Sequence, residues 1–241
     1  MNNHQKFTFH QLGNFLNPAL VLLELGLIKS PSWQKLNSVN HPYLCKGLIL
    51  FLLLLSTAAF ALKPHTATYT LSVSDFKIAT EYRTLTQKNN SYLYRASAKT
   101  TGLASLIKDY EIKAQSTFSI NEFGLHSSKY QYFERDGDVV KKDINITLNS
   151  PQVDSLSLFL AFTYALEKNP NQTDFYFKVN DGKEVKEKHY QQVKSDDKNL
   201  IKIVRPGKQL EAYFAKNKHY LPVLINKKKF SYTLTNVVFT K

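Results

Sequence analysis

The chain has 241 residues, with 32 Lys and Arg against 19 Asp and Glu, and a formal net charge of +13. The one cysteine, Cys45, excludes a disulfide framework and a zinc site built from cysteines. The basic excess suits an anionic partner such as a lipid head-group surface or an acidic polysaccharide, although it is also what keeps an exported protein soluble.

The stretch 45–61 has the organisation of a secretory signal peptide. Lys46 supplies a positive flank, residues 48–55 form an unbroken apolar run, and Ala59-Phe60-Ala61 has the small-x-small pattern of a cleavage site. We therefore predict cleavage after Ala61 and a periplasmic location for the rest of the chain. The alternative is an uncleaved inner-membrane anchor, facing the periplasm, whose apolar stretch falls short of the about twenty residues of a full span.

Two alternatives stay open for residues 1–44, which we expect to be disordered. Either translation starts later from an alternative codon, near Val39 or Leu44, or the segment is a true N-terminal extension. In the second case residues 17–28 are apolar enough for a short helix on a membrane surface. Export makes nucleic acid the least fitting anionic partner, and the protein then contacts a membrane only through the signal segment, if that segment is uncleaved.

Residues 62–241 suffice for a single β-rich domain. Apolar and polar residues alternate in stretches such as "HTATYTLSVS", "SYLYRASAK" and "VVKKDINITL", which is typical of half-buried strands. Six such strands follow one another from Thr66 to Leu148, and turns of hairpin length join them. The economical topology is an antiparallel meander. A change of parity in the fourth strand predicts a bulge near Gln115-Ser116.

The period changes once, in "VDSLSLFLAFTYALEK". Apolar residues recur there every three to four positions, and Pro151 and Pro170 flank the segment, so we predict a helix over about 153–167. Strand patterning resumes after it. Asp181-Gly182 predicts a hairpin turn, and Pro222 marks an edge strand or the entry to a strand.

These elements predict a mainly β fold with one packed helix, in the α+β class. We expect a strongly curved antiparallel meander sheet that forms an open half-barrel wrapped around the helix. Bulky aromatic residues suit such a curved sheet, where most of them fill the core. If the half-barrel is open inside, some of them instead line an apolar pocket able to take an acyl chain.

The candidates for this pocket lie on the helix, on the strands and in one connection. The connection, "TTGLASLIK" (residues 100–108), is either a mobile loop that gates a cavity or a cap whose leucines cover one end of the core. The pocket candidates are Phe159, Phe162, Leu103, Leu106, Tyr94 and Tyr132.

The chain after Ala61 carries little that points to catalysis, a cofactor or a metal. Its four histidines, at positions 65, 126, 189 and 219, have no second histidine or carboxylate at metal-ligand spacing. It has no glycine-rich phosphate loop, no nucleophile-elbow pattern and no paired-carboxylate motif. We therefore expect no metal and no cofactor, and favour a protein that is not an enzyme.

Four stretches, in this order, resemble the exported bacterial proteins of domain-of-unknown-function family 3108. They are "ATYTLSVSDFKIATEYRTL", "SYLYRASAKTTGLASLIKDYEIKAQSTF", "QVDSLSLFLAF" and "AYFAKNKHYLPVLINKK", followed by the terminal "YTLTNVV". The resemblance runs from about Pro64 to Val238 and implies a periplasmic, mostly β protein with no assigned activity. The chain departs from the family pattern at the compact stretch "DINITLNSPQVD", where a longer segment is expected between the last meander strand and the helix.

Three hypotheses for the function follow. The leading one is a non-enzymatic periplasmic protein that binds a lipid-like ligand or envelope component in the concave face of its sheet. The second is a structural or interaction protein of the cell envelope, with a filled core and a basic surface. The third, a hydrolase acting on envelope glycans or lipids, has the least support.

Overall fold

The structure, a computed structural model, describes residues 61–74, 76–102, 104–105 and 108–240. These residues belong to one compact unit, Ala59–Lys241. The predicted extension 1–44, most of the predicted signal peptide, and the pocket candidates Leu103 and Leu106 lie outside the described residues.

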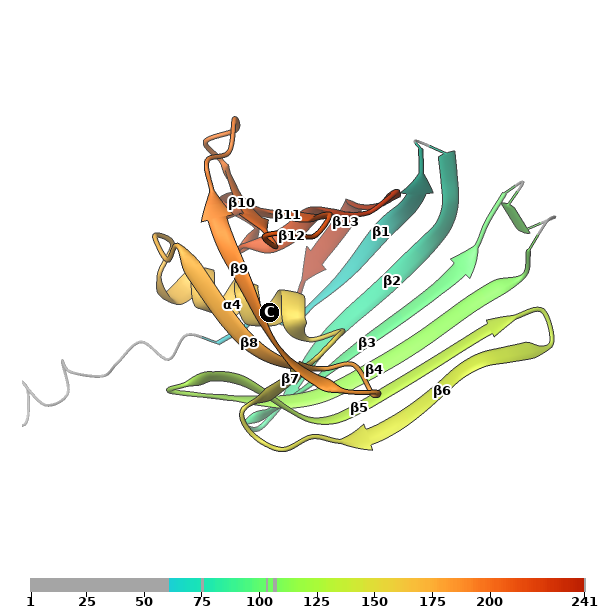
Figure 1. Ribbon diagram of the computed structural model, residues 1–241, viewed down its shortest axis with the longest axis horizontal. Helices are drawn as coiled ribbons and strands as arrows, with labels where there is room; N and C mark the ends of the chain where they lie inside the picture. The colour runs from blue at the N-terminus through green and yellow to red at the C-terminus, as the bar shows by residue number, and fades with distance from the viewer. Residues whose placement is uncertain (1–60, 75, 103, 106–107, 241) are drawn as a thin grey trace, which may run out of the picture. The chain divides into compact units, whose positions relative to one another are not determined.

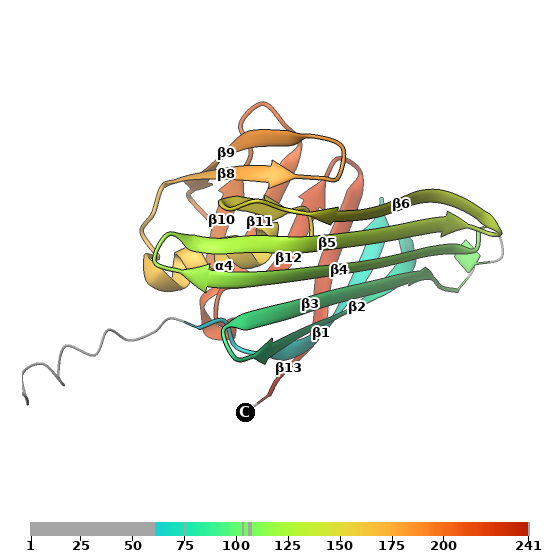
Figure 2. The same ribbon diagram turned by 90° about the horizontal axis from the view of Figure 1, so that it is seen from below.

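The first six strands form the predicted antiparallel meander, and each pairs with the next in the chain. Figure 2 shows the later members of this group side by side. Alternation explains these strands, because apolar side chains recur on one face, as with the buried Tyr92, Tyr94, Ala96 and Ala98 of β3. The edge strand β6 has no buried residue. The strands are β1 (His65–Val73), β2 (Phe76–Lys88), β3 (Ser91–Thr100), β4 (Tyr110–Asn121), β5 (Gly124–Asp136) and β6 (Val139–Thr147).

The strands that follow β6 in the chain belong to the same sheet and lie on the other side of β1. Strand β13 pairs with β1, so the strand order in the described 13-stranded sheet is β6-β5-β4-β3-β2-β1-β13-β12-β11-β10-β9-β8-β7. The sheet is not closed, since β6 and β7 each end the order. The remaining strands are β7 (Gln152–Asp154), β8 (Asp174–Asn180), β9 (Val185–Val193), β10 (Leu200–Val204), β11 (Leu210–Ala215), β12 (Leu221–Lys227) and β13 (Phe230–Phe239).

Two details of the predicted topology are wrong. The helix, α4 (Leu158–Lys168), begins five residues later than predicted, because Val153 lies on β7 and pairs with Val179. The β7–β8 pair is parallel, so the sheet is mostly, not entirely, antiparallel. The bulge of β4 falls between Thr117 and Phe118, two residues beyond the predicted place.

The start of α4 is held by a buried polar cluster around Asp154, which is fully buried. Its carboxylate accepts hydrogen bonds from the backbone N–H of Leu156 (2.8 Å) and of Ser157 (2.9 Å). It also accepts from Ser157 Oγ at 2.9 Å and from Ser116 Oγ, on β4, at 2.5 Å. The cluster fixes where the chain leaves β7 and turns into the helix, and it ties this turn to β4.

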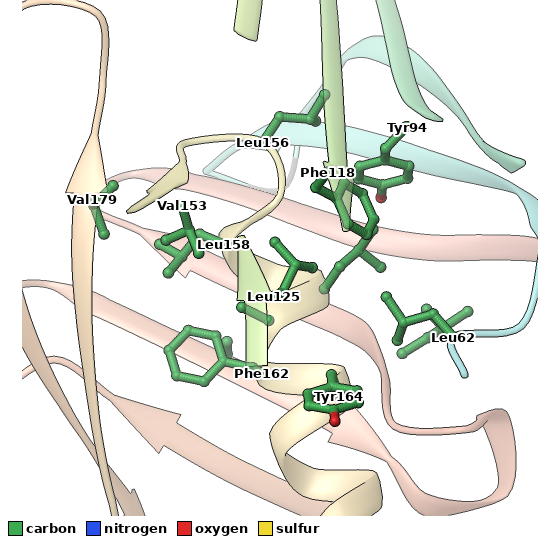
Figure 3. Close-up of a cluster of buried hydrophobic side chains, with 14 of the residues drawn as sticks. Leu62, Tyr94, Phe118, Leu125, Val153, Leu156, Leu158, Phe162, Tyr164 and Val179 are labelled. Carbon is green, nitrogen blue, oxygen red and sulfur yellow. The ribbon is translucent and has the colours of Figure 1, made fainter. Parts of the chain in front are cut away.

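The sheet is curved, and α4 lies inside the curve (Figure 1). The ring of Phe162 contacts four aromatic rings from three strands, at centroid distances between 4.9 and 5.7 Å. These four are Phe175, Phe177, Tyr190 and Phe214. Such edge-on contacts between aromatic rings stabilise the core beyond the burial of their area. Figure 3 shows the wider cluster, which includes Leu62, the first residue after the predicted cleavage site.

Candidate ligand-binding cavity

A cavity of about 610 Å³ lies on the concave side of the sheet, beside the start of α4. Its walls come from both halves of the sheet: β1–β5 on one side, and β9, the β10–β11 turn, β12 and β13 on the other. The volume lies within the range of small-molecule sites, which are concave and mostly apolar with a few polar groups.

Small side chains in the middle of β3 and β4 leave the space open. Along the inner side of β3, Tyr92 and Tyr94 are followed by Ala96 and Ala98. Ala96 lies opposite Ala114 of β4, and all three alanines line the cavity. The large side chains at one end of these strands pack against the helix, whereas the alanines leave room on the concave side of the sheet.

Aromatic and aliphatic side chains form the walls around this alanine floor. Tyr132 of β5 lies directly opposite Ala114, and Phe159 comes from the first turn of α4. Burial is the main cause, and the hydrogen bond to Glu134 the next, that raises the pKa of Tyr132 far above its ordinary value. Its hydroxyl therefore stays protonated. Other wall residues are Leu71, Tyr130, Leu156, Leu158, Tyr190, Ile225 and Tyr232.

A buried ion pair on β2 faces the same space. Arg83 donates from Nε to Glu81 Oε1 (2.9 Å) and from Nη2 to Glu81 Oε2 (3.2 Å), and the two side chains are 7% and 10% exposed. The guanidinium lies 4.5 Å from the ring centre of Tyr69. Burial by itself lowers the pKa of Arg83, but Glu81, together with Tyr94 and Tyr69, more than offsets this, so the net shift of the pKa is upward and Arg83 stays charged.

Arg83 keeps one donor without a partner. Its Nη1 is buried and makes no hydrogen bond, although the guanidinium lines the cavity. A buried donor left unpaired costs about 1–3 kcal/mol. Because this nitrogen is enclosed by the protein, it is part of the cost of burying the ion pair and is not presented to the cavity.

The opposite wall is basic. Five cationic residues line the cavity there: Lys188 on β9, Arg205 and Lys208 in the β10–β11 turn, and Lys227 and Lys228 at the end of β12. Glu81 is the one carboxylate among the lining residues, and Arg83 already pairs with it. The net charge of the cavity wall is therefore strongly positive.

The structure separates the predicted pocket residues into two groups. Phe159 and Tyr132 line the cavity, whereas Phe162 (1% exposed) and Tyr94 (2% exposed) are core residues that do not line it. Of the predicted cleavage residues, Ala59 lies outside the described part and Ala61 is exposed.

The sequence analysis missed the charged residues of the site and its alanine floor. One signal was available for the ion pair: Glu81 and Arg83 occupy the same strand face as Ala79 and Leu85, where the alternation calls for apolar residues. The basic wall has no such local signal, because its residues come from three separate segments.

A second hollow, of about 630 Å³, lies between the side of α4, β8 and the β4–β5 turn. Two aromatic residues that line it, Phe123 and Tyr176, are 82% and 62% exposed. His126 also lines it, and its buried Nδ1 has no hydrogen-bond partner. Among the described residues this hollow has no buried ion pair and no cluster of cations like that of the first cavity, so we take the first cavity as the candidate site.

Within the described ranges, no group of three or more His, Cys, Asp or Glu side chains is placed to hold a metal ion. None of the helices in this part of the chain is long and apolar enough to cross a membrane. No protein-family model, no curated protein and no solved structure matches the chain.

Proposed function

We propose that this is an exported, periplasmic protein without enzymatic activity, which holds a lipid-like ligand in the cavity beside α4. The sheet acts as a half-barrel around the helix, similar in outline to lipoprotein carriers, a likeness of fold that does not by itself transmit function. The four stretches that resemble domain-of-unknown-function family 3108 support export and a mostly β fold.

The observation that carries the proposal is the cavity itself. Its floor is made of the small side chains of Ala96, Ala98 and Ala114, whereas aromatic side chains fill the surrounding core. Larger side chains at these three positions would fill this part of the concave face, so the alanines keep room for another molecule. An apolar chain inserted between Phe159 and the alanines would fill that room.

A binding role suits the polar groups at the cavity better than catalysis does. Glu81 and Arg83 hold each other in a two-point ion pair, so neither is free to act as a general base or a nucleophile activator. The cavity-lining serine, Ser155, has no hydrogen bond to a histidine or carboxylate among the described residues.

A filling variant tests the proposal. The protein, produced from the full chain in an exporting bacterium and extracted mildly, is expected to carry lipid in native mass spectrometry. After lipid removal it should bind the neutral fluorescent probe N-phenyl-1-naphthylamine. Ala98→Phe places a ring in the cavity and should weaken probe binding at least tenfold.

Ser97→Phe is the matched control, because Ser97 lies on the exposed face of the same strand. It should bind the probe as the original protein does. A purified protein that carries no lipid and also fails to bind the probe would contradict the proposal. An unchanged affinity for the probe in a folded Ala98→Phe variant would contradict it as well. The first result would favour the second candidate, an interaction protein of the envelope.

A further inference from the structure

The basic wall of the cavity has an ordered arrangement. Lys188, Arg205 and Lys227 each lie two residues along the chain from a buried side chain of the core. Lys188 precedes its neighbour and Lys227 follows its own on the same strand face, whereas Arg205 comes just beyond the end of β10. Those buried neighbours are Tyr190, Ile203 and Ile225. The inward rows of β9 and β12, and the chain just after β10, thus change from uncharged to cationic along this wall of the cavity.

All three cations line the same cavity, and the charges of Arg205 and Lys227 both act on Lys188. Burial lowers the pKa of Lys188, followed by the charge of Arg205 and, more weakly, that of Lys227. Asp181 and Glu184 oppose this shift without cancelling it. The guanidinium of Arg205 lies 6.0 Å from the ring centre of Tyr190, at the cavity wall.

No protein carboxylate neutralises the set. In the part of the chain that the structure describes, the ion pairs involve other lysines and arginines, and none of the five cations of the basic wall takes part in one. Like charges that share a partly desolvated space repel one another, and an anion placed between them removes that penalty.

The wall across the cavity holds the Arg83–Glu81 ion pair and so carries no net charge of its own. Arg83 is 7% exposed, lines the cavity, and has an Nη1 without a hydrogen-bond partner. Glu81 already balances the charge of Arg83, and the enclosed Nη1 is not accessible to a molecule in the cavity. The net positive charge stays with the opposite wall.

We propose that the ligand is an anionic amphiphile, whose carboxylate or phosphate group binds Lys188, Arg205 and Lys227 while its apolar chain lies over the alanine floor. This inference rests on the proposed function and adds the chemical class of the ligand. Lys208 and Lys228 border the same wall and raise the local concentration of anions by long-range attraction.

The test compares an acidic and a neutral probe on the lipid-free protein from the full chain. The acidic probe is cis-parinaric acid, a fluorescent fatty acid, and the neutral ones are its methyl ester and N-phenyl-1-naphthylamine. We expect the acid to bind at least tenfold more tightly than the methyl ester. Its affinity should fall as sodium chloride is raised, because salt screens the charges at the cavity mouth.

A triple variant, Lys188→Gln, Arg205→Gln and Lys227→Gln, should lose at least tenfold in affinity for the acid and less than twofold for N-phenyl-1-naphthylamine. The control removes the same charge at exposed positions outside the cavity, with Lys88→Gln, Lys129→Gln and Lys141→Gln. It should leave both affinities unchanged. If the triple variant unfolds, Arg205→Gln alone should give the same selective loss to a smaller extent.

The outcomes separate this inference from the proposed function. Equal binding of the acid and the methyl ester, with N-phenyl-1-naphthylamine still bound, overturns the anionic ligand and leaves a lipid-binding cavity. No binding of any probe overturns both. Sodium phosphate that displaces the acid without displacing the methyl ester would show that the acidic group binds as an independent anion. The proposal expects no such displacement at millimolar phosphate, because the apolar chain supplies much of the affinity.

Discussion

Glu167 is an acidic side chain in a place that disfavours its charge. Its side chain is 14% exposed near the end of α4, and burial raises its pKa to about 7, although Lys63 acts to lower it. His219 Nδ1 lies 3.7 Å from its Oε1. Burial, followed by Lys63, lowers the pKa of His219, so the imidazole is neutral when Glu167 ionises and gives no compensating charge.

This residue makes the stability of the domain depend on pH. The folded pKa of Glu167 lies above its unfolded value. The free energy of unfolding is therefore highest below about pH 4, where Glu167 is protonated, and it falls as the pH rises through about 7. Glu167→Gln removes the penalty. We expect it to raise the unfolding free energy by about 1–2 kcal/mol at pH 8 and to change it little at pH 4.

Thermal unfolding at the two pH values measures the effect. Glu122→Gln, at an exposed position, serves as the control and should shift neither midpoint. A Glu167→Gln variant with the same midpoint as the original protein at pH 8 would show that the carboxylate is already solvated there.

At the scale of the elements, the position of α4 depends on the buried cluster around Asp154. Asp154→Ala leaves the backbone N–H groups of Leu156 and Ser157 and the hydroxyl of Ser116 without their acceptor. Unpaired buried donors are costly, so we expect a loss of about 3–5 kcal/mol in urea unfolding. Asp196→Ala, in an exposed turn, should cost less than about 0.5 kcal/mol.

The sequence predicts most of the elements because alternation is a local signal that long strands repeat many times. β1–β6 follow from it directly. β7 has three residues, too few for a period to show, and its parallel partner β8 comes after the helix. Val153 and Leu156 fit the helical spacing, so the later start of α4 could be found only from the tertiary contacts of Asp154.

The candidate site was predictable only in its apolar part. Phe159 and Phe162 lie three residues apart on one helix and have the same chemistry, yet one lines the cavity and the other is enclosed by four rings. The difference comes from which strands pack against each, a contact between distant parts of the chain. The same reason hides the basic wall, whose cations meet only after β9, β10 and β12 have assembled.

At the scale of the whole molecule, the pairing of β1 with β13 joins the two halves of the sheet. The register runs from His65 opposite Phe239 to Val73 opposite Phe230, interrupted by one bulge. Deleting residues 230–241 exposes the edges of both β1 and β12, and removes Tyr232 from the cavity wall. We expect the shortened chain to lose its cooperative unfolding transition and to aggregate.

Circular dichroism during heating, together with size-exclusion chromatography, measures this outcome. Removing only Thr240 and Lys241, which lie beyond β13, is the control and should leave the transition intact. A monomeric, cooperatively folded product of the longer deletion would mean that each half of the sheet is stable without the other.

The β1–β13 pairing also determines when the sheet can be completed during synthesis. The ribosome synthesises β1 early and its second neighbour, β13, last. About 160 residues separate the two strands, and synthesis proceeds at roughly 5–20 residues per second. For that interval of many seconds the nascent chain carries an unfinished strand edge, open to wrong partners. Until its final segment has emerged, β1 lacks its second partner strand and the two halves of the sheet cannot join.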